Sequence, residues 1–238
     1  MTGKIWFIKN MTHEAAGLFS SFAEKEKVSY SVVDLHRGES FPEVNPGHAV
    51  VILGGPDSAN DRTPKITGEI EAIRKCLGAG ISMLGVCLGL QLLAKAAGGT
   101  VFRNSVKEIG FRDPAGEWFE MEKTSGGKKD PLLEGIPDRC KVFQLHGQTV
   151  GLTSSMSCLA RGRSCENQIV KIQDRAYGIQ GHVELSERMF EDWLVADGDL
   201  RELSSEKLRR DFASVRGKLE RTSGTIFKNF LRISGLLG

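Results

Sequence analysis

The sequence lacks the cysteine pairs that a disulfide framework or a zinc ribbon requires. Its five cysteines stand at positions 76, 87, 140, 158 and 165, and none of them forms a C-x-x-C pair. The odd number and the scattered spacing favour a reducing compartment. His13, His36 and His48 show no metal-ligand spacing with one another. We therefore expect free thiols, with neither a bound metal nor another cofactor.

Long apolar runs and a dominant charge are absent as well. The apolar run near the N-terminus, Ile5–Ile8, is too short for a signal peptide, and no stretch approaches the length of a bilayer span. The formal net charge of +2 gives no bulk field toward nucleic acid or acidic lipid. With 238 residues, 40% hydrophobic and 26% charged, the chain has an ordinary globular composition. We expect a water-soluble cytoplasmic protein that binds neither nucleic acid nor membrane.

Strand-like and helix-like segments alternate over the first hundred residues. Apolar runs predict strands at Ile5–Ile8, Ala49–Leu53 and Ile81–Val86, and β-branched residues predict another at Val28–Leu35. Apolar residues at helical spacing predict helices over residues 13–27, 66–77 and 88–97. Buried strands without polar alternation favour a parallel sheet covered by helices on both faces.

The pattern changes after Thr100. Short strand candidates with turns between them predict a mixed or antiparallel part, and they lie at 101, 106–109, 118–121, 142–145, 157–160, 168–172 and 176–179. After Glu184 the chain is helix-like, with predicted helices at 186–196, 204–221 and 223–237. We expect one α/β domain over residues 1–238, with a core at 1–196 and a helical C-terminal extension at 197–238.

The segment Gly85–Ala94, GVCLGLQLLA, carries the sharpest chemical signal. A buried strand ends, Cys87 follows, and a glycine stands two residues later where a helix begins. A nucleophile on such a tight strand-to-helix turn needs small neighbours. The helix N-terminus favours the thiolate, and its free N–H groups point to where an oxyanion would form. A lone cysteine is usually a buried structural residue, but the G-x-C-x-G-x-Q pattern favours a nucleophile.

A histidine and a carboxylate close an apolar strand in Gly178–Glu184, GIQGHVE. His182 and Glu184 are two residues apart, so an extended strand places them on one face. There the carboxylate can orient the imidazole that takes a proton from a thiol. On its own, an H-x-E at a strand end is commonplace, and only the cysteine turn makes it informative.

A glycine pair follows the strand at Ala49–Leu53, in the segment LGGPDSAND. Gly54 and Gly55 could offer backbone N–H groups to an anion, although a tight turn is the commoner use of Gly-Gly-Pro. No Gly-Lys-Ser/Thr follows, so a phosphate-binding P-loop is poorly supported.

These three segments, in this order and spacing, resemble the class I glutamine amidotransferases, above all the amidotransferase part of GMP synthase and its stand-alone relatives. The resemblance covers roughly residues 1–196. It implies an open, mostly parallel flavodoxin-like sheet with extra antiparallel strands. It implies that Cys87 forms a γ-glutamyl thioester with glutamine, that His182 shuttles the proton to departing ammonia, and that Glu184 orients His182.

The resemblance also implies the surroundings of the nucleophile. The oxyanion hole would be built from Leu88 and the backbone of Gly54 or Gly55. Gln91 stands where the family contacts the substrate. Lys107–Gly110, K-E-I-G, is similar to the segment that follows the nucleophile helix in the family, and Leu145–Thr149, L-H-G-Q-T, is similar to its H-G-D-T stretch. His146, Gly147 and Gln148 are thereby implied near the glutamine pocket, with His146 as a shaping residue.

The chain departs from the family pattern in two segments, at positions 181 and 183 in one and at position 148 in the other. The family usually has Q-F-H-P-E around the histidine, where this chain has Gln180-Gly181-His182-Val183-Glu184. Glycine at 181 predicts a less firmly held His182, and Val183 lacks proline's constraint on φ. Gln148 replaces a common aspartate, which predicts a weaker contact with the substrate's α-amino group.

Three functions remain open on these observations. The first is a glutaminase that takes glutamine as substrate and supplies ammonia to a synthetase on another chain. The second is a hydrolase of another γ-glutamyl substrate, and the third is a non-catalytic, amidotransferase-like regulatory module. The extension after residue 196 either packs on the core or forms a docking surface for a synthetase or a second copy of the chain. Comparing ammonia release from glutamine with cleavage of γ-glutamyl peptides separates the first two functions.

Overall fold

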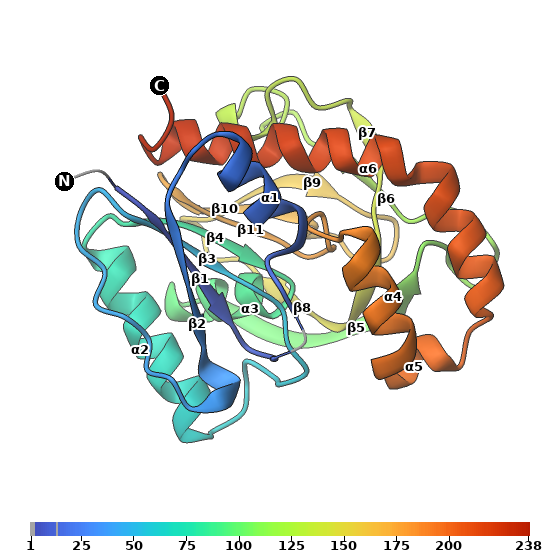
Figure 1. Ribbon diagram of the computed structural model, residues 1–238, viewed down its shortest axis with the longest axis horizontal. Helices are drawn as coiled ribbons and strands as arrows, with labels where there is room; N and C mark the ends of the chain where they lie inside the picture. Colours follow the sequence, from blue (N-terminus) through green and yellow to red (C-terminus); the bar gives the residue numbers. More distant parts are fainter. Residues whose placement is uncertain (1–2, 13) are drawn as a thin grey trace.

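A nine-stranded sheet forms the centre of the molecule (Figure 1). The computed structural model describes residues 3–12 and 14–238. Five neighbouring strands run parallel, in the order β2-β1-β3-β4-β11, which is the doubly wound order of flavodoxin-like sheets. They are β1 (Ile5–Lys9), β2 (Tyr30–Asp34), β3 (Ala49–Ile52), β4 (Ser82–Val86) and β11 (Ala176–Ile179).

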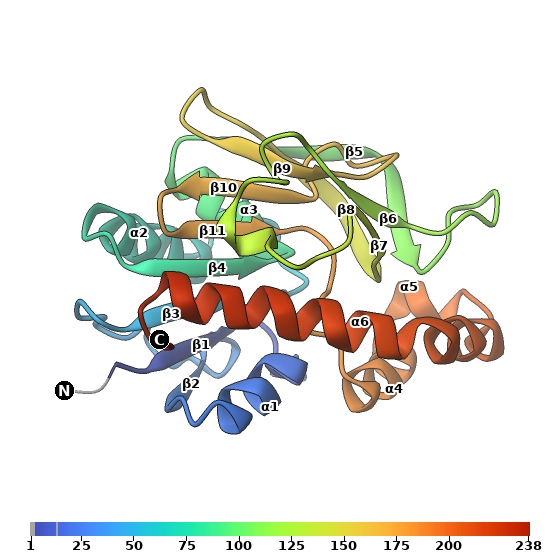
Figure 2. The ribbon, with the colours of Figure 1, turned by 90° about the horizontal axis from the view of Figure 1, so that it is seen from above.

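The sheet continues beyond β11 with antiparallel strands in the order β10-β9-β6-β7. These are β6 (Glu120–Lys123), β7 (Arg139–Lys141), β9 (Ser157–Arg161) and β10 (Ile169–Gln173). A separate antiparallel pair joins β5 (Thr100–Gly110) to β8 (Gln144–Gly151). Figure 2 shows the series of strands with the last helix running across it. The predicted α/β class, with a parallel first half and an antiparallel second half, is confirmed.

Helices cover both faces of the parallel strands. On one face lie α1 (Gly17–Lys25) and α6 (Ser205–Ile233), and on the other lie α2 (Pro64–Gly78) and α3 (Leu88–Ala96) (Figure 1). Alternate residues of β1 supply both layers, because Phe7 enters the first hydrophobic cluster and Ile8 the second. The inner strands β3, β4 and β11 are buried along their whole length, because neither of their faces meets water.

The C-terminal extension differs from its predicted form. A short helix, α5 (Gly198–Arg201), follows α4 (Glu187–Ala196), and the two helices predicted at 204–221 and 223–237 are one continuous helix, α6. The prediction broke this helix near Thr222-Ser223-Gly224 on the small and polar residues there. In the structure Ser223 is fully buried, and a Cβ at Gly224 would lie 3.0 Å from the ring of Phe22. The small residues therefore serve close packing against α1.

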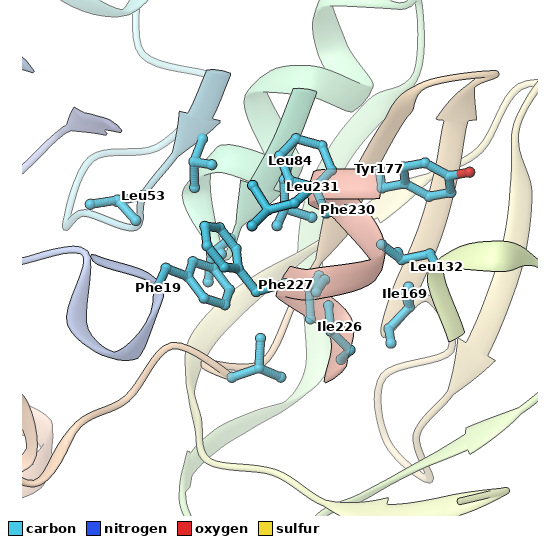
Figure 3. Packing of buried hydrophobic residues seen from close by; sticks show 14 of the residues in the cluster. Phe19, Leu53, Leu84, Leu132, Ile169, Tyr177, Ile226, Phe227, Phe230 and Leu231 are labelled. Carbon is cyan, nitrogen blue, oxygen red and sulfur yellow. The ribbon is translucent and has the colours of Figure 1, made fainter. Parts of the chain in front are cut away.

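Aromatic stacking fastens α6 to the core (Figure 3). The rings of Phe227 and Phe19 are stacked with centroids 4.7 Å apart, and Phe7 lies behind them at 6.4 Å from Phe227. The first half of α6 packs against α4, where Phe212 stacks on Phe190 at 4.6 Å. The extension is thus part of the hydrophobic core. None of the helices within residues 3–12 and 14–238 combines the length and apolar content of a bilayer crossing.

The stacking predicts a large loss of stability for Phe227→Ala. We expect the free energy of unfolding to fall by about 3–5 kcal/mol, because a fully buried ring is removed and a cavity is left. Urea unfolding followed by circular dichroism measures this change. Leu203→Ala, at a side chain that is 42% exposed before α6, is the matched control and should cost under about 1 kcal/mol. Equal losses in the two variants would contradict the assignment.

A buried carboxyl on α2 predicts a pH-dependent loss of stability. Burial raises the pKa of Glu69 from 4.5 to about 7, although Asn10 donates a hydrogen bond to it. Between these values the folded protein keeps a proton that the unfolded chain has lost, so stability falls as pH rises. We expect Glu69→Gln to gain up to about 3 kcal/mol relative to wild type between about pH 5 and pH 8. Urea unfolding at the two pH values tests this, and a constant difference would refute it.

Candidate active site

Cys87 occupies a strained turn between β4 and α3. Its φ of +51° and ψ of −107° lie in a region that non-glycine residues rarely adopt. The flanking glycines explain how the turn is held. A Cβ at Gly85 would lie 2.4 Å from the backbone of Gly89, and one at Gly89 would lie 2.2 Å from the carbonyl oxygen of Ile52. The G-x-C-x-G spacing therefore lets the α3 N-terminus press against β3 and β4 with the sulfur at the turn.

His182 follows β11, the strand that pairs with β4. Its backbone N–H donates to the carbonyl of Phe143 at 2.8 Å, and its Nδ1 donates to Oε1 of Glu184 at 2.8 Å. The edge of its ring meets Trp193, with centroids 4.8 Å apart. These contacts hold the imidazole firmly despite glycine at 181, where a Cβ would lie 2.4 Å from a methyl group of Val142. The looseness predicted for His182 is thus offset by its neighbours.

The electrostatics of His182 favour a charged imidazole. Burial alone would lower its pKa, but the Glu184 carboxylate and the Cys87 sulfur outweigh burial and hold the pKa well above its ordinary value. Because Glu184 takes Nδ1, the other ring nitrogen is left for the sulfur of Cys87. An imidazole beside a thiol can take the thiol's proton, and the thiolate is the nucleophilic form of cysteine.

A cavity of about 490 Å³ opens over Cys87 and His182. Leu88 and Gly55, two of the predicted oxyanion residues, line it. Gly54, the third, lies beside Cys87 and His182, because a Cβ there would be 3.1 Å from Cε1 of His182 and 3.7 Å from Cβ of Cys87. The volume is within the range of small-molecule sites.

The predicted substrate-binding residues also line this cavity, namely Gln91, His146, Gly147 and Gln148. The backbone carbonyl of Gln148 accepts hydrogen bonds from Nε2 of Gln91 at 3.2 Å and from Nδ1 of His146 at 3.0 Å. The side chain of Gln148 is held as well, since Ser58 Oγ donates to its Oε1 at 2.8 Å. Hydrogen bonds therefore hold Gln91, His146 and Gln148 in place along one face of the cavity.

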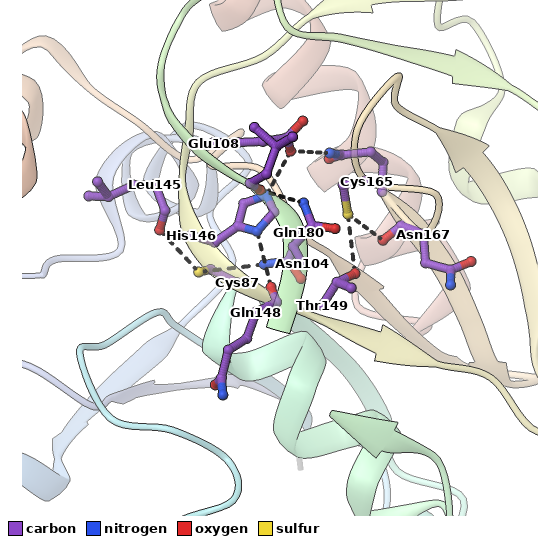
Figure 4. A network of polar contacts seen from close by, with 12 residues as sticks. Cys87, Asn104, Glu108, Leu145, His146, Gln148, Thr149, Cys165, Asn167 and Gln180 are labelled. Atoms are coloured by element: carbon purple, nitrogen blue, oxygen red, sulfur yellow. Dashed lines mark hydrogen bonds and ion pairs between the residues drawn. The ribbon is translucent and has the colours of Figure 1, made fainter. Parts of the chain in front are cut away.

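A buried polar network stands behind this face of the cavity (Figure 4). His146 lies between two acceptors, the Gln148 carbonyl at Nδ1 and the Glu108 carboxyl at Nε2, 2.9 Å away. His146 and Glu108 must therefore share a proton in that contact. Cys165 completes a group whose ligand-type atoms lie within 4.8 Å of one another. Its sulfur contacts Thr149 Oγ1, and burial raises its pKa to about 12. Each of the three residues in this group therefore has hydrogen-bond partners within the protein.

The sequence did not predict every residue that lines the cavity, and two of those it missed contact or neighbour His182. Glu14, in the loop between β1 and α1, and Trp193, on α4, both line the cavity. Burial raises the pKa of Glu14 to about 7, with His182 opposing the shift. Neither residue stands in a motif, and only the fold brings them close to Cys87 and His182.

Comparison with known proteins agrees with this geometry. The family model "Glutamine amidotransferase class-I" matches residues 19–198. The glutamine amidotransferase-like protein YfeJ of Salmonella typhimurium is 28% identical over 77% of this chain and 76% of its own length. One subunit of the glutamine-hydrolyzing GMP synthase of Pyrococcus abyssi is 29% identical over 62% of this chain and 71% of that one. The chain spans only about a quarter of the longer GMP synthases that it matches.

A solved structure extends the likeness to the whole chain. The crystal structure of a glutamine amidotransferase from Thermotoga maritima superposes with a TM-score of 0.85 at 26% identity. The match covers 98% of this chain and 99% of that one, so it includes the C-terminal helix. With the fold, the cysteine turn and the family match in agreement, this chain belongs to the class I glutamine amidotransferases.

Proposed function

We propose that this chain hydrolyses the side-chain amide of glutamine, using Cys87 as nucleophile. The observation that carries the proposal is the arrangement of Cys87, His182 and Glu184 at one cavity. The thiolate attacks the amide carbon, and the oxyanion that forms accepts hydrogen bonds from the backbone N–H groups of Leu88 and Gly55. As the C–N bond breaks, His182 gives its proton to the nitrogen, which leaves as ammonia.

The second half of the reaction regenerates the thiolate. Water attacks the γ-glutamyl thioester while His182 takes a proton from it, and the C–S bond breaks to release glutamate. Glu184 keeps Nδ1 of His182 protonated throughout, so the other ring nitrogen alone exchanges protons. Neither half needs a metal ion or another cofactor.

We propose further that the ammonia passes to a synthetase on another chain. Relatives such as the Pyrococcus abyssi protein are named as one subunit of GMP synthase. The longer GMP synthases, of which this chain matches about a quarter, place such a segment in a larger protein. These names support a two-component arrangement for this chain and leave the acceptor open.

A second candidate function rests on Gln148. A carboxylate at this position would attract an α-amino group, whereas Gln148 is neutral and its Oε1 already accepts from Ser58. A γ-glutamyl conjugate that gains its binding energy elsewhere in the cavity would suffer less from this change. Comparing kcat/KM for glutamine and for γ-glutamyl peptides decides between the two, because the better substrate has the larger value.

Loss of the nucleophile should abolish ammonia release. We expect Cys87→Ala to lower glutamate and ammonia formation by at least about a thousandfold, because no thioester can form. Cys158→Ala is the matched control, since that half-buried cysteine lies outside the cavity lining, and it should keep wild-type turnover. Turnover that survives in Cys87→Ala would remove the proposed mechanism.

Thiol labelling tests the proposed roles of Cys87 and His182 without a substrate. Burial raises the pKa of Cys140 to about 11 and that of Cys165 to about 12, and it also raises the pKa values of Cys76 and Cys158. We expect iodoacetamide at neutral pH to label Cys87 at least about tenfold faster than these thiols. Peptide mapping by mass spectrometry gives the rates. In His182→Ala the labelling of Cys87 should slow, and an unchanged rate would contradict activation of the thiol by His182.

A further inference from the structure

Glu14 stands beside Cys87 and His182 and is outside the triad. A Cβ at Gly54 would lie 2.7 Å from Oε2 of Glu14 and 3.1 Å from Cε1 of His182. The same point is 3.7 Å from Cβ of Cys87. The carboxyl, the imidazole and the nucleophile thus converge on one position, and glycine at 54 leaves the room for them.

The Glu14 carboxyl, which lies beside His182, is free to accept hydrogen bonds. Within residues 3–12 and 14–238 its oxygens accept no hydrogen bond from a protein donor, although the residue lines the cavity. The other nearby acids are engaged, since Glu184 accepts from His182 and Asp197 accepts from the backbone N–H of Leu200. Such an acceptor beside His182 is available to a donor on the substrate.

The reaction supplies a donor at this side of the cavity. The scissile nitrogen must lie next to His182 to receive its proton, whereas the oxyanion lies at the α3 N-terminus with Leu88. Before it leaves, the nitrogen carries two N–H bonds, and after protonation it carries three. An acceptor close to His182 therefore faces N–H groups at every stage of C–N cleavage.

We propose that Glu14 binds the departing nitrogen of the amide, an inference that rests on the proposed glutaminase chemistry. Glu14 forms and breaks no covalent bond. Its carboxylate accepts one N–H, which turns the nitrogen lone pair toward His182 after the C–S bond to Cys87 has formed and while the C–N bond breaks. His182 supplies the proton, and neutral ammonia departs.

The charge state of Glu14 makes the contact sensitive to pH. Burial raises its pKa to about 7, His182 and Lys9 oppose the shift, and Glu184 and Asp197 add to it. The carboxylate therefore forms as pH rises through about 7, and a charged acceptor binds N–H more strongly than a neutral one. The amide reaction should lose kcat/KM as pH falls below this value.

The test compares leaving groups with and without N–H, namely glutamine and the γ-methyl ester of glutamate. We expect Glu14→Ala to lower kcat/KM for glutamine about 10- to 100-fold more than for the ester. Because kcat/KM covers the steps up to acylation, the shared thioester hydrolysis does not enter. Glu14→Gln, which keeps the shape and a neutral acceptor, should lose less and should lack the rise near pH 7. Glu24→Gln, on the exposed side of α1, is the matched control.

The outcomes separate the inference from the proposed function. If Glu14→Ala lowers kcat/KM equally for the amide and the ester, Glu14 only supports the structure of its loop. A lowered melting temperature that explains both losses would lead to the same conclusion. If kcat/KM is unchanged for both substrates, Glu14 takes no part in the reaction. A wild-type chain that cleaves neither substrate would overturn the glutaminase itself, and this inference with it.

Discussion

The close contact between the α3 N-terminus and strands β3 and β4 governs the geometry of this molecule. It is made of backbone, because Gly85, Gly89 and the carbonyl of Ile52 approach within distances that no side chain tolerates. The contact accompanies the strained φ of Cys87, and it places Cys87 and Leu88, the first residue of α3, at the cavity. Any larger residue at either glycine would push the helix off the sheet and the sulfur away from His182.

The pairing of β4 with β11 brings Cys87 and His182 together although they are far apart in the sequence. His182 follows Cys87 by almost a hundred residues, yet β11 lies next to β4 with Ile179 opposite Val86. The backbone N–H of Cys87 donates to the carbonyl of Ile179 at 2.8 Å, which ties the two active-site segments directly. The candidate catalytic groups thus meet at the carboxyl ends of two adjacent parallel strands, where doubly wound sheets place their sites.

The sequence predicts the parts of this site that have local causes. Apolar runs and helical spacing predict the parallel strands, and the glycine pattern predicts the turn at Cys87. It does not reveal Glu14, because a single acid in a loop has no local signature and owes its position to the packing of α1. The proton shared by Glu108 and His146 depends on the pairing of β5 with β8 across 38 residues. The break predicted within α6 failed because small residues mark both helix ends and close helix contacts.

The stacking of α6 on α1 has a practical consequence for where this protein can be cut. The family match ends at residue 198, which suggests a natural boundary for a minimal catalytic fragment. Truncation there would uncover the aromatic face formed by Phe7 and Phe19, and contiguous exposed apolar surface of this kind drives self-association. We therefore expect a stably folded fragment of this protein to include α6, which reaches to Ile233 and follows the segment that holds the candidate catalytic residues.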